Sequence, residues 1–327
     1  MIAVIAAFFI SAVLCLLLTR AQGHWQILDI PNERSLHSEP TPRTGGIAIL
    51  AGLATGELLA WLTGGQHLAT WPNILSVALL ATVALIDDRH TLGAAPRLLI
   101  QSGVVVLLLF THTGHAAPAA LLVIAGLFLV WMINLYNFMD GMDGFAGGMA
   151  VIGFATFGLA AWQAGDATLA LGCGVVVAAT AGFLLVNFPP ARLFMGDSGS
   201  TVLGLLAGLL ILSAHTRGVL PVWLGILVFS PFIVDASITL ARRLLRGERV
   251  WEAHKTHYYQ RLVELGWGHR RTVLAEYALM AACGASALVA ARLTITGQTV
   301  IITVWAVIYI TLMYRIHRAE RRRDLHS

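Results

Sequence analysis

Apolar runs long enough to cross a bilayer follow one another along almost the whole of the 327-residue chain. A helix needs about 20 mostly apolar residues to span the hydrocarbon core of a membrane. Only 12% of the residues are charged and 57% are hydrophobic, whereas soluble domains carry about twice that charged fraction. These features exclude an ordinary soluble domain and predict an all-α, polytopic integral membrane protein.

The apolar runs indicate about eleven transmembrane helices. They cover residues 2–19, 45–63, 72–86, 98–111, 118–135, 149–163, 168–187, 200–213, 220–240, 273–291 and 298–314. The third, fourth and eighth runs are short for a full crossing, so they must borrow residues from their flanks or tilt little. No Lys or Arg precedes the first run, which we therefore interpret as a retained anchor and not as a signal peptide.

Lys and Arg are divided unequally between the two sides that these crossings define. Alternate loops hold 19 of the 21 basic residues, and only Arg217 and Arg292 fall on the opposite side. The positive-inside rule predicts that the basic side is cytoplasmic, with the N-terminus outside and the C-terminus inside. The predicted cytoplasmic loops are at about 20–44, 87–97, 136–148, 188–199, 241–272 and 315–327.

Four clusters of polar residues lie in these loops, although the crossings were counted from hydropathy alone. The clusters are Asp87-Asp88-Arg89, Asn137 to Gly144, Phe194 to Gly199, and His254 to His257. Carboxylates, imidazoles and amides that meet at one membrane face suit a divalent metal and a phosphorylated substrate. The three cysteines all lie in apolar runs, so neither a disulfide framework nor a zinc site is indicated.

The second cluster has a regular spacing. Asn134, Asn137, Asp140 and Asp143 recur every three residues, which places them on one face of a helix or 3₁₀ turn. The loop contains no Lys or Arg, and its oxygen ligands suit Mg²⁺, with Mn²⁺ as the alternative. Capping of a helix that starts near Phe145 would explain one of the two acids alone, but not both.

The third cluster lies where the eighth apolar run begins. Asp197 or Ser198 at that position is expected to cap the helix, and the same place would offer free backbone N–H groups to a phosphate. Phe194 could stack on a nucleobase or belong to the aromatic belt of the membrane interface.

The fourth cluster lies in the most basic loop. If the segment is helical, His254, His257 and Arg261 share one face, which would suit a pyrophosphate. Asp235 lies a few residues inside the ninth run, and an acid within a membrane segment is a functional candidate.

With these residues in view, the chain resembles the polyprenyl-phosphate N-acetylhexosamine-1-phosphate transferases, which include the phospho-MurNAc-pentapeptide translocase and the GlcNAc-1-phosphate transferases. Residues 31–46 look like the first cytoplasmic loop of that family, and the four clusters match its later motifs in the right order. Four ordered motifs are far more specific than any one of them. The resemblance implies eleven helices with the N-terminus outside, in agreement with the hydropathy count.

The resemblance also implies roles for individual residues. Asp197 would be the principal Mg²⁺ ligand, and Asp87 and Asp88 would handle the lipid phosphate and the metal region, with Asp88 as a second metal ligand. The catalytic set is then Asp87, Asp88, Asp140, Asp197, His254 and His257. The residues expected to bind substrate, including the uracil contacts of Asn187 and Phe194, are Asn137, Asp143, Asn187, Phe194, Arg43, Arg89 and Arg261.

The implied reaction is transfer of a sugar 1-phosphate from a UDP-linked amino sugar to undecaprenyl phosphate, with release of UMP. The expected setting is a bacterial inner membrane, with residues 1–327 as a single transmembrane catalytic domain whose active site faces the cytoplasm. Membrane lipids are the expected surroundings, family likeness suggests a homodimer, and no nucleic acid partner is expected. The peptidoglycan translocases carry three adjacent histidines where this chain has only His254 and His257. This departure favours UDP-GlcNAc or a UDP-N-acetyl-6-deoxyhexose, in the branch that starts O-antigen or capsule chains.

Three alternatives remain beside this interpretation. One is the MurNAc-pentapeptide substrate itself, and another is a UbiA-type prenyltransferase, whose Asp-rich motifs space Asn and Asp by four and not by three. A transporter would place its ionisable groups near mid-bilayer and not at one face. The sequence names neither the sugar nor the lipid length, because specificity is expected to depend on the loop from Trp251 to Arg271.

Overall fold

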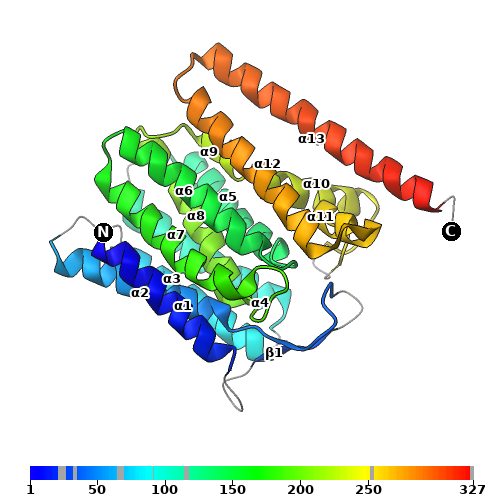
Figure 1. Cartoon of the computed structure of the whole chain (residues 1–327). Helices are drawn as coiled ribbons and strands as arrows, with labels where there is room; N and C mark the ends of the chain where they lie inside the picture. Colours follow the sequence, from blue (N-terminus) through cyan, green and yellow to red (C-terminus); the bar gives the residue numbers. More distant parts are fainter. Residues whose placement is uncertain are drawn as a thin grey trace.

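The computed structural model describes residues 1–20, 27–31, 35–64, 70–90, 92–113, 118–250 and 254–324. The described chain is almost entirely helical, and its helices pack into one bundle with the C-terminal helix at one edge (Figure 1). The strands β1 (Leu28–Asp29) and β2 (Thr41–Pro42) form one antiparallel pair in the first loop. The predicted all-α membrane architecture is confirmed. Residues 32–34 of the first-loop motif and 251–253 of the expected specificity loop lie outside the described residues.

Each predicted apolar run coincides with a helix or a pair of helices. The helices are α1 (Ile2–Leu18), α2 (Gly45–Leu62), α3 (Trp71–His90), α4 (Ala94–Thr113), α5 (Ala119–Phe138), α6 (Phe145–Gln163), α7 (Ala167–Asn187), α8 (Asp197–Thr216), α9 (Val222–Val228), α10 (Ser230–Leu245), α11 (Tyr258–Leu262), the π-helical turn η2 (Val263–Trp267), α12 (Gly268–Ala290) and α13 (Ile295–Asp324). Among the described helices, nine are long and apolar enough to cross a membrane, and ten if α9 and α10 form one span. The count of eleven and the orientation stay predictions.

The three short runs borrow residues from their flanks, as expected. The helices α3, α4 and α8 each have 20 residues, because polar residues that hydropathy leaves out continue the helix beyond the apolar run. The last two turns of α3 therefore include Asp87 and Asp88. Polar side chains at such an end can reach the membrane interface, so the helix need not stop where its apolar run stops.

The ninth run is broken rather than straight. α9 and α10 meet at Phe229 and are bent by 84°. Pro231 lies in the first turn of α10, where a missing N–H is tolerated but a continuous helix from α9 is not. The bend directs α10 towards α11, the short helix that follows the histidine cluster.

Small residues bring α2 and α8 together. A Cβ atom at Gly46 would lie 2.3 Å from the backbone N of Gly199 and 2.5 Å from Ser198 Oγ. The backbone N–H groups of Gly45 and Gly46 donate to the carbonyls of Phe194 and Met195 at 2.9 and 2.7 Å. Close backbone approach at small residues is usual between membrane helices. Here it fixes the first loop against the segment that carries Asp197.

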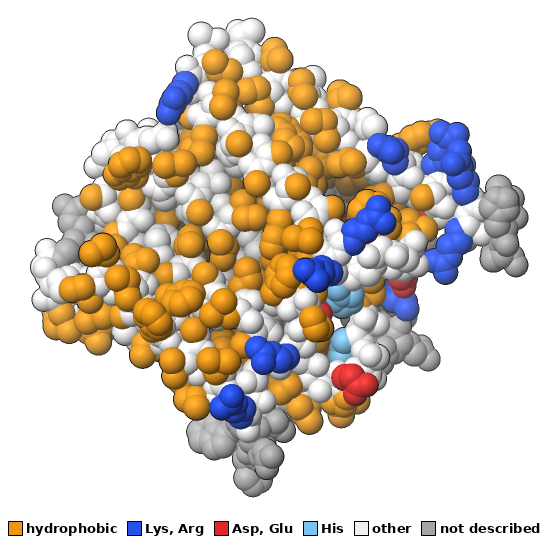
Figure 2. All heavy atoms as spheres, viewed as in Figure 1, with side chains coloured by type: hydrophobic (Ala, Val, Ile, Leu, Met, Phe, Trp, Pro, Cys, Tyr) orange, Lys and Arg blue, Asp and Glu red, His pale blue; other side chains and the backbone are white. Residues whose placement is uncertain are grey.

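The outer surface of the bundle suits a lipid environment. Large apolar side chains such as Leu99, Val123 and Leu127 are more than half exposed. Figure 2 shows hydrophobic side chains over the broad visible face, with most of the visible Lys and Arg near one edge. The distribution agrees with a multi-pass membrane protein whose basic loops gather on one side.

We expect Gly46→Ala to lower the melting temperature of the purified protein in detergent by several degrees, because the added Cβ meets backbone that cannot move alone. The matched control is Gly103→Ala in α4, where an added Cβ meets nothing within 4 Å. Alanine is the better helix former, so the control should keep or slightly raise the melting temperature. Equal melting temperatures for the two variants would contradict the close α2–α8 contact.

Candidate active site

Two cavities adjoin at the ends of the helices. The first, of about 120 Å³, is lined mainly by polar residues, and the second is larger at about 410 Å³. Both are lined by Asn137, Asp140 and Asp197, so these three residues stand where the two cavities meet. The second cavity continues along an apolar wall of α3 and α4 formed by Leu80, Val83, Ala84 and Ile100. A polar pocket and a partly apolar one thus share one set of carboxylates.

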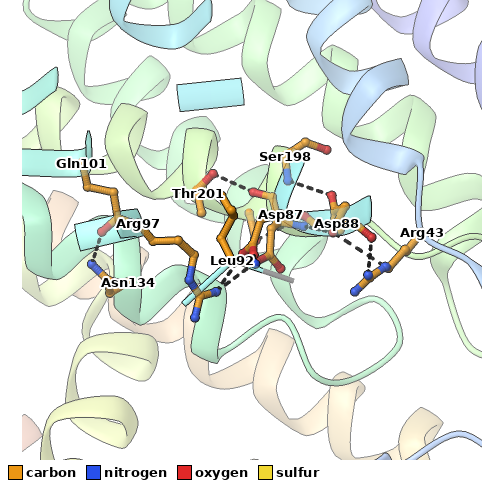
Figure 3. Close-up of polar contacts among 12 residues, drawn as sticks. Arg43, Asp87, Asp88, Leu92, Arg97, Gln101, Asn134, Ser198 and Thr201 are labelled. Atoms are coloured by element: carbon orange, nitrogen blue, oxygen red, sulfur yellow. Dashed lines mark hydrogen bonds and ion pairs between the residues drawn. The ribbon is translucent and has the colours of Figure 1, made fainter. Parts of the chain in front are cut away.

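Asp88 joins three segments of the chain at the carboxylate cluster, and Figure 3 shows it between Ser198 and Arg43. Its side chain is fully buried and accepts the backbone N–H groups of Asp197 at 3.3 Å and Ser198 at 3.4 Å. Arg43 lies 3.7 Å from Asp88 Oδ1 through Nε and also donates to the backbone carbonyl of Asp88. Asp88 therefore joins the end of α3 to the beginning of α8 and to the first loop.

This arrangement corrects two expectations for the N-terminus of α8. The N-cap is Gly196, with φ of +74°, and not Asp197 or Ser198, which are the first helical residues. The backbone N–H groups of Asp197 and Ser198 are not free for a phosphate, because the carboxylate of Asp88 already accepts them. The sequence could not show this, since Asp88 comes from a helix more than 100 residues away.

Arg97 connects the side chains of Asp87 and Asp197. Its Nη1 lies 2.9 Å from Asp87 Oδ2 and 3.5 Å from Asp197 Oδ2. Asp87 also accepts the backbone N–H of Leu92, in the turn between α3 and α4. Figure 3 shows Arg97 directed at Asp87. About a quarter of the Asp197 side chain is exposed, whereas the side chains of Asp87 and Asp88 are buried. Asp197 is therefore the most accessible of these three acids.

Residues 139–144 form a short loop braced by tyrosines. The helix α5 ends at Phe138, so the helix or 3₁₀ turn predicted from the three-residue spacing does not include Asp140 and Asp143. Asp140 lines both cavities, whereas Asp143 lines only the first. Tyr277 donates to the carbonyl of Gly144 at 2.6 Å. The loop contains Gly141, where a Cβ would lie 2.3 Å from the hydroxyl of Tyr259. The bracing holds Asp140 in place.

The electrostatic field at Asp140 is negative. Burial, together with the nearby carboxylates of Asp197 and Asp88, raises the pKa of Asp140 well above its usual range. A cation placed among these groups would be attracted by the same charges that disfavour ionisation.

Phe194, Asn187 and Asp143 all line the first cavity. The ring of Phe194 makes an edge contact with His37, with centroids 4.9 Å apart. Asn187 accepts the N–H of Gly144 and donates to the carbonyl of Leu193, both at 2.9 Å, so both ends of its amide group are engaged in holding loops.

Asp143 connects two further segments to this pocket. It accepts the N–H of Ala191 at 3.0 Å and lies 3.2 Å from the Nδ1 atom of His269 in α12.

His254 and His257 line the second cavity with their rings 4.8 Å apart. The condition under which these residues would share a helix face is not met: α11 begins at Tyr258, His257 is its N-cap in extended geometry, and His254 precedes it. Arg261 points elsewhere and forms a two-point ion pair with Glu320 of α13. The three residues therefore do not share a helix face, because the chain turns sharply between them.

Of the two remaining predicted residues, Arg43 lies at the cavities and Arg89 does not. Arg43 lines the first cavity and contacts Asp88, as described above. Arg89 is an exposed side chain at the end of α3 and is not among the described residues that line the two cavities. The roles of all these residues as substrate ligands stay predictions.

The donor set fits Mg²⁺ bound together with a substrate. Among the described residues, no three His, Cys, Asp or Glu side chains converge on one point. Mg²⁺ typically takes only one or two carboxylates and completes its octahedron with water and phosphate oxygens. Asp197 and Asp140, which line both cavities, supply such oxygens in a negative field, and within the described chain no thiolate lies among the lining residues. Asp88, the other predicted metal ligand, is fully buried and is not among the described residues that line either cavity.

Several residues of the site escaped the sequence analysis. Three of them, His37, His269 and Tyr259, line the cavities. The fourth, Tyr277, braces the 139–144 loop through its hydrogen bond to Gly144. Tyr277 lies in a predicted apolar run, where nothing in the sequence marks it. His269 lies in the loop from Trp251 to Arg271, which was expected to set specificity, but it was not named individually. Tyr259 follows His257 directly, so its proximity to the histidine cluster was the one available signal.

The sequence is similar to that of known proteins. Residues 71–215 match the sequence profile of glycosyl transferase family 4. A "Probable undecaprenyl-phosphate N-acetylglucosaminyl 1-phosphate transferase" of Bacillus subtilis (strain 168) is 30% identical over 320 residues, covering 90% of this chain and 87% of the relative.

Two other relatives differ in their named substrates. A "Decaprenyl-phosphate N-acetylglucosaminephosphotransferase" of Mycolicibacterium smegmatis is 32% identical, covering 76% of this chain and 71% of the relative. A "Phospho-N-acetylmuramoyl-pentapeptide-transferase" of Levilactobacillus brevis is 30% identical, covering 71% of this chain and 78% of the relative.

We expect Asn187→Leu to lower the melting temperature in detergent, since it leaves the N–H of Gly144 and the carbonyl of Leu193 buried without their partner. Each such group costs about 1–3 kcal/mol. The control is Gln163→Leu, which removes an exposed amide that accepts from Arg292 at the opposite end of the bundle and should change little. An Asn187→Leu protein as stable as the control would show that the amide does not hold these loops.

Proposed function

Since the chain belongs to glycosyl transferase family 4, we propose that it transfers a sugar 1-phosphate from a UDP-linked N-acetylhexosamine to undecaprenyl phosphate and releases UMP. The names of the relatives support the polyprenyl-phosphate acceptor and the amino-sugar donor. One observation carries the proposal within this chain: two different cavities share Asp140 and Asp197. A transferase with two substrates needs such a junction, where the reacting groups can be held together.

The first cavity is the proposed nucleotide-sugar pocket. Its lining combines the phenyl ring of Phe194 with the amides of Asn137 and Asn187 and with carboxylates of the 139–144 loop. An aromatic face can stack on a nucleobase, while the polar groups can bind ribose, sugar and base edges. Arg43 at the same cavity provides positive charge for the pyrophosphate.

The second cavity is the proposed acceptor pocket. At one end lie Asp87 and Arg97, and away from them runs the apolar wall of Leu80, Val83 and Ile100. An isoprenoid chain would lie against that wall, and its phosphate would meet the polar end. Arg97 is the cation best placed to contact this phosphate, because it lies between Asp87 and Asp197.

The proposed chemistry is a direct displacement. An oxygen of the lipid phosphate attacks the β-phosphorus of the UDP-sugar, the bond to the bridging oxygen breaks, and UMP leaves with that oxygen and its electron pair. A phosphate monoester loses its second proton near pH 6, so the attacking group needs little help from a base. Asp87 is the proposed base that would take this last proton from the lipid phosphate before the attack.

Asp197 is the proposed Mg²⁺ ligand, and Asp88, whose carboxylate accepts the backbone N–H of Asp197, would hold it in position. When bound, Mg²⁺ would neutralise charge on the pyrophosphate and on the departing UMP. His257 and His254, which also line the second cavity, would contribute positive or hydrogen-bonding contacts to the same phosphates.

The setting proposed for this reaction is the cytoplasmic face of a bacterial inner membrane. The unequal division of Lys and Arg between the loops supports that orientation. Two separated histidines in place of three adjacent ones support UDP-GlcNAc or a UDP-N-acetyl-6-deoxyhexose over the MurNAc-pentapeptide donor, and with it a role in starting O-antigen or capsule chains.

The proposal predicts that purified protein releases UMP from a UDP-N-acetylhexosamine only when undecaprenyl phosphate and Mg²⁺ are both present. A panel of UDP-GlcNAc, UDP-GalNAc, a UDP-N-acetyl-6-deoxyhexose and UDP-MurNAc-pentapeptide identifies the donor, and EDTA should stop the reaction until Mg²⁺ is restored. Without lipid, labelled UMP should not exchange into the UDP-sugar. Robust exchange would overturn direct displacement, and inactivity with every donor would overturn the proposed reaction.

We expect Asp197→Asn to reduce kcat by at least about 100-fold, because an amide cannot replace the charge of the carboxylate toward a metal-bound phosphate. Its melting temperature should stay within a few degrees of the unmodified protein. The matched control is Asp166→Asn, an acid that caps α7 and pairs with Arg217 away from both cavities. Near-normal turnover in Asp197→Asn would remove the metal assignment.

A further inference from the structure

Asp235 is a buried acid of α10 whose contacts the proposed reaction leaves unexplained. Only 7% of the residue is exposed, and its two carboxylate oxygens accept four hydrogen bonds. Oδ1 accepts from His257 Nδ1 at 3.2 Å and from the backbone N–H of Tyr258 at 3.0 Å, while Oδ2 accepts from the N–H of Tyr259 at 3.1 Å. The fourth donor is the hydroxyl of Thr239, one turn further along α10.

The bonds to Asp235 and one ring contact together fix the orientation of His257. Because a carboxylate can only accept, the Nδ1 atom of His257 must carry the proton that it shares with Asp235. The two backbone bonds hold the first turn of α11, to which His257 is attached. The ring of His257 also lies nearly parallel to that of Tyr259, at 17° with centroids 5.9 Å apart.

The other ring nitrogen is left for the substrate. His257 is 2% exposed, yet it lines the second cavity together with His254. With Nδ1 directed at Asp235, Nε2 lies on the opposite side of the ring. An imidazole fixed by one nitrogen and free at the other is a common arrangement where a histidine must meet a ligand in a defined tautomer.

We propose that Asp235 is a positioning residue for the transfer reaction: it holds His257 through Nδ1 so that Nε2 faces the phosphates in the second cavity. Asp235 itself does not line either cavity among the described residues, so it acts through His257. The proposal rests on the proposed function, and it explains why an acid is retained in a membrane-spanning segment. The broken ninth span contributes too, because the bend at Phe229 is what directs α10 at α11.

A simpler role is that Asp235 only anchors α11. A second acid, Glu320, also holds this helix, through Arg261, but it does not touch His257. The two acids therefore separate anchoring from orientation. If anchoring were all that mattered, Asp235→Asn and Glu320→Gln would impair the enzyme in the same way.

The test is a double-mutant cycle on kcat and KM, with UMP release from the active UDP-sugar as the assay. We expect Asp235→Asn to lower kcat at least about 10-fold with a smaller change in the KM for undecaprenyl phosphate. In a His257→Gln background the same substitution should change kcat by less than about twofold, because the group through which it acts is gone. An equal loss in both backgrounds, an unchanged kcat, or a matching loss in Glu320→Gln would overturn the proposal.

Two measurements keep the outcome clear. UMP release by the unmodified protein tests the proposed function, while the ratios between variants test Asp235. If Asp235→Asn does not fold, Thr239→Val takes its place in the cycle, since it removes one bond to Asp235 without touching His257. It should lower kcat about two- to fivefold, and only while His257 is present; a loss independent of His257 would again overturn the proposal.

Discussion

The carboxylates of Asp87, Asp88 and Asp197 lie close enough to repel one another, and the rest of the site depends on how this repulsion is offset. Two unit charges about 4 Å apart near a protein surface repel each other by roughly 4 kcal/mol. The structure offsets this with Arg97 between Asp87 and Asp197, with Arg43 at Asp88, and with two backbone N–H groups of α8. The compensation ties α3, α4, α8 and the first loop into one unit, and Asp197 stays accessible at the junction of the cavities.

The loops that carry the polar residues are braced from several helices. Tyr277 of α12 and Asn187 of α7 both bind the backbone of Gly144, while Asp235 of α10 binds the turn that begins at His257. Side chains on short loops keep a defined geometry only when neighbouring elements hold them. Here the holding groups come from apolar helices, where an isolated polar group would be costly, so each is satisfied by a specific partner.

The location of the site explains how two unlike substrates could meet. Its polar pocket opens among the loops, and its larger neighbour continues along the apolar sides of α3 and α4. A water-soluble nucleotide sugar and a membrane-bound phosphate would then approach the same carboxylates from different surroundings. Because both pockets are lined by Asp197 and Asp140, a substrate from water and one from the membrane would be held next to each other with their reacting phosphates in contact.

By itself, the sequence determined the helical membrane architecture, because apolar length and the division of Lys and Arg are properties of single segments. It also identified Asp140 and Asp197 as candidates, since their motifs are local. Only the tertiary structure decided that Asp88 accepts the first N–H groups of α8, that Arg261 pairs with Glu320, and that Asp235 contacts His257. These partners lie 22 to 109 residues apart in sequence. Such pairs arise from helix packing and from the bend between α9 and α10, which no local pattern of residues encodes.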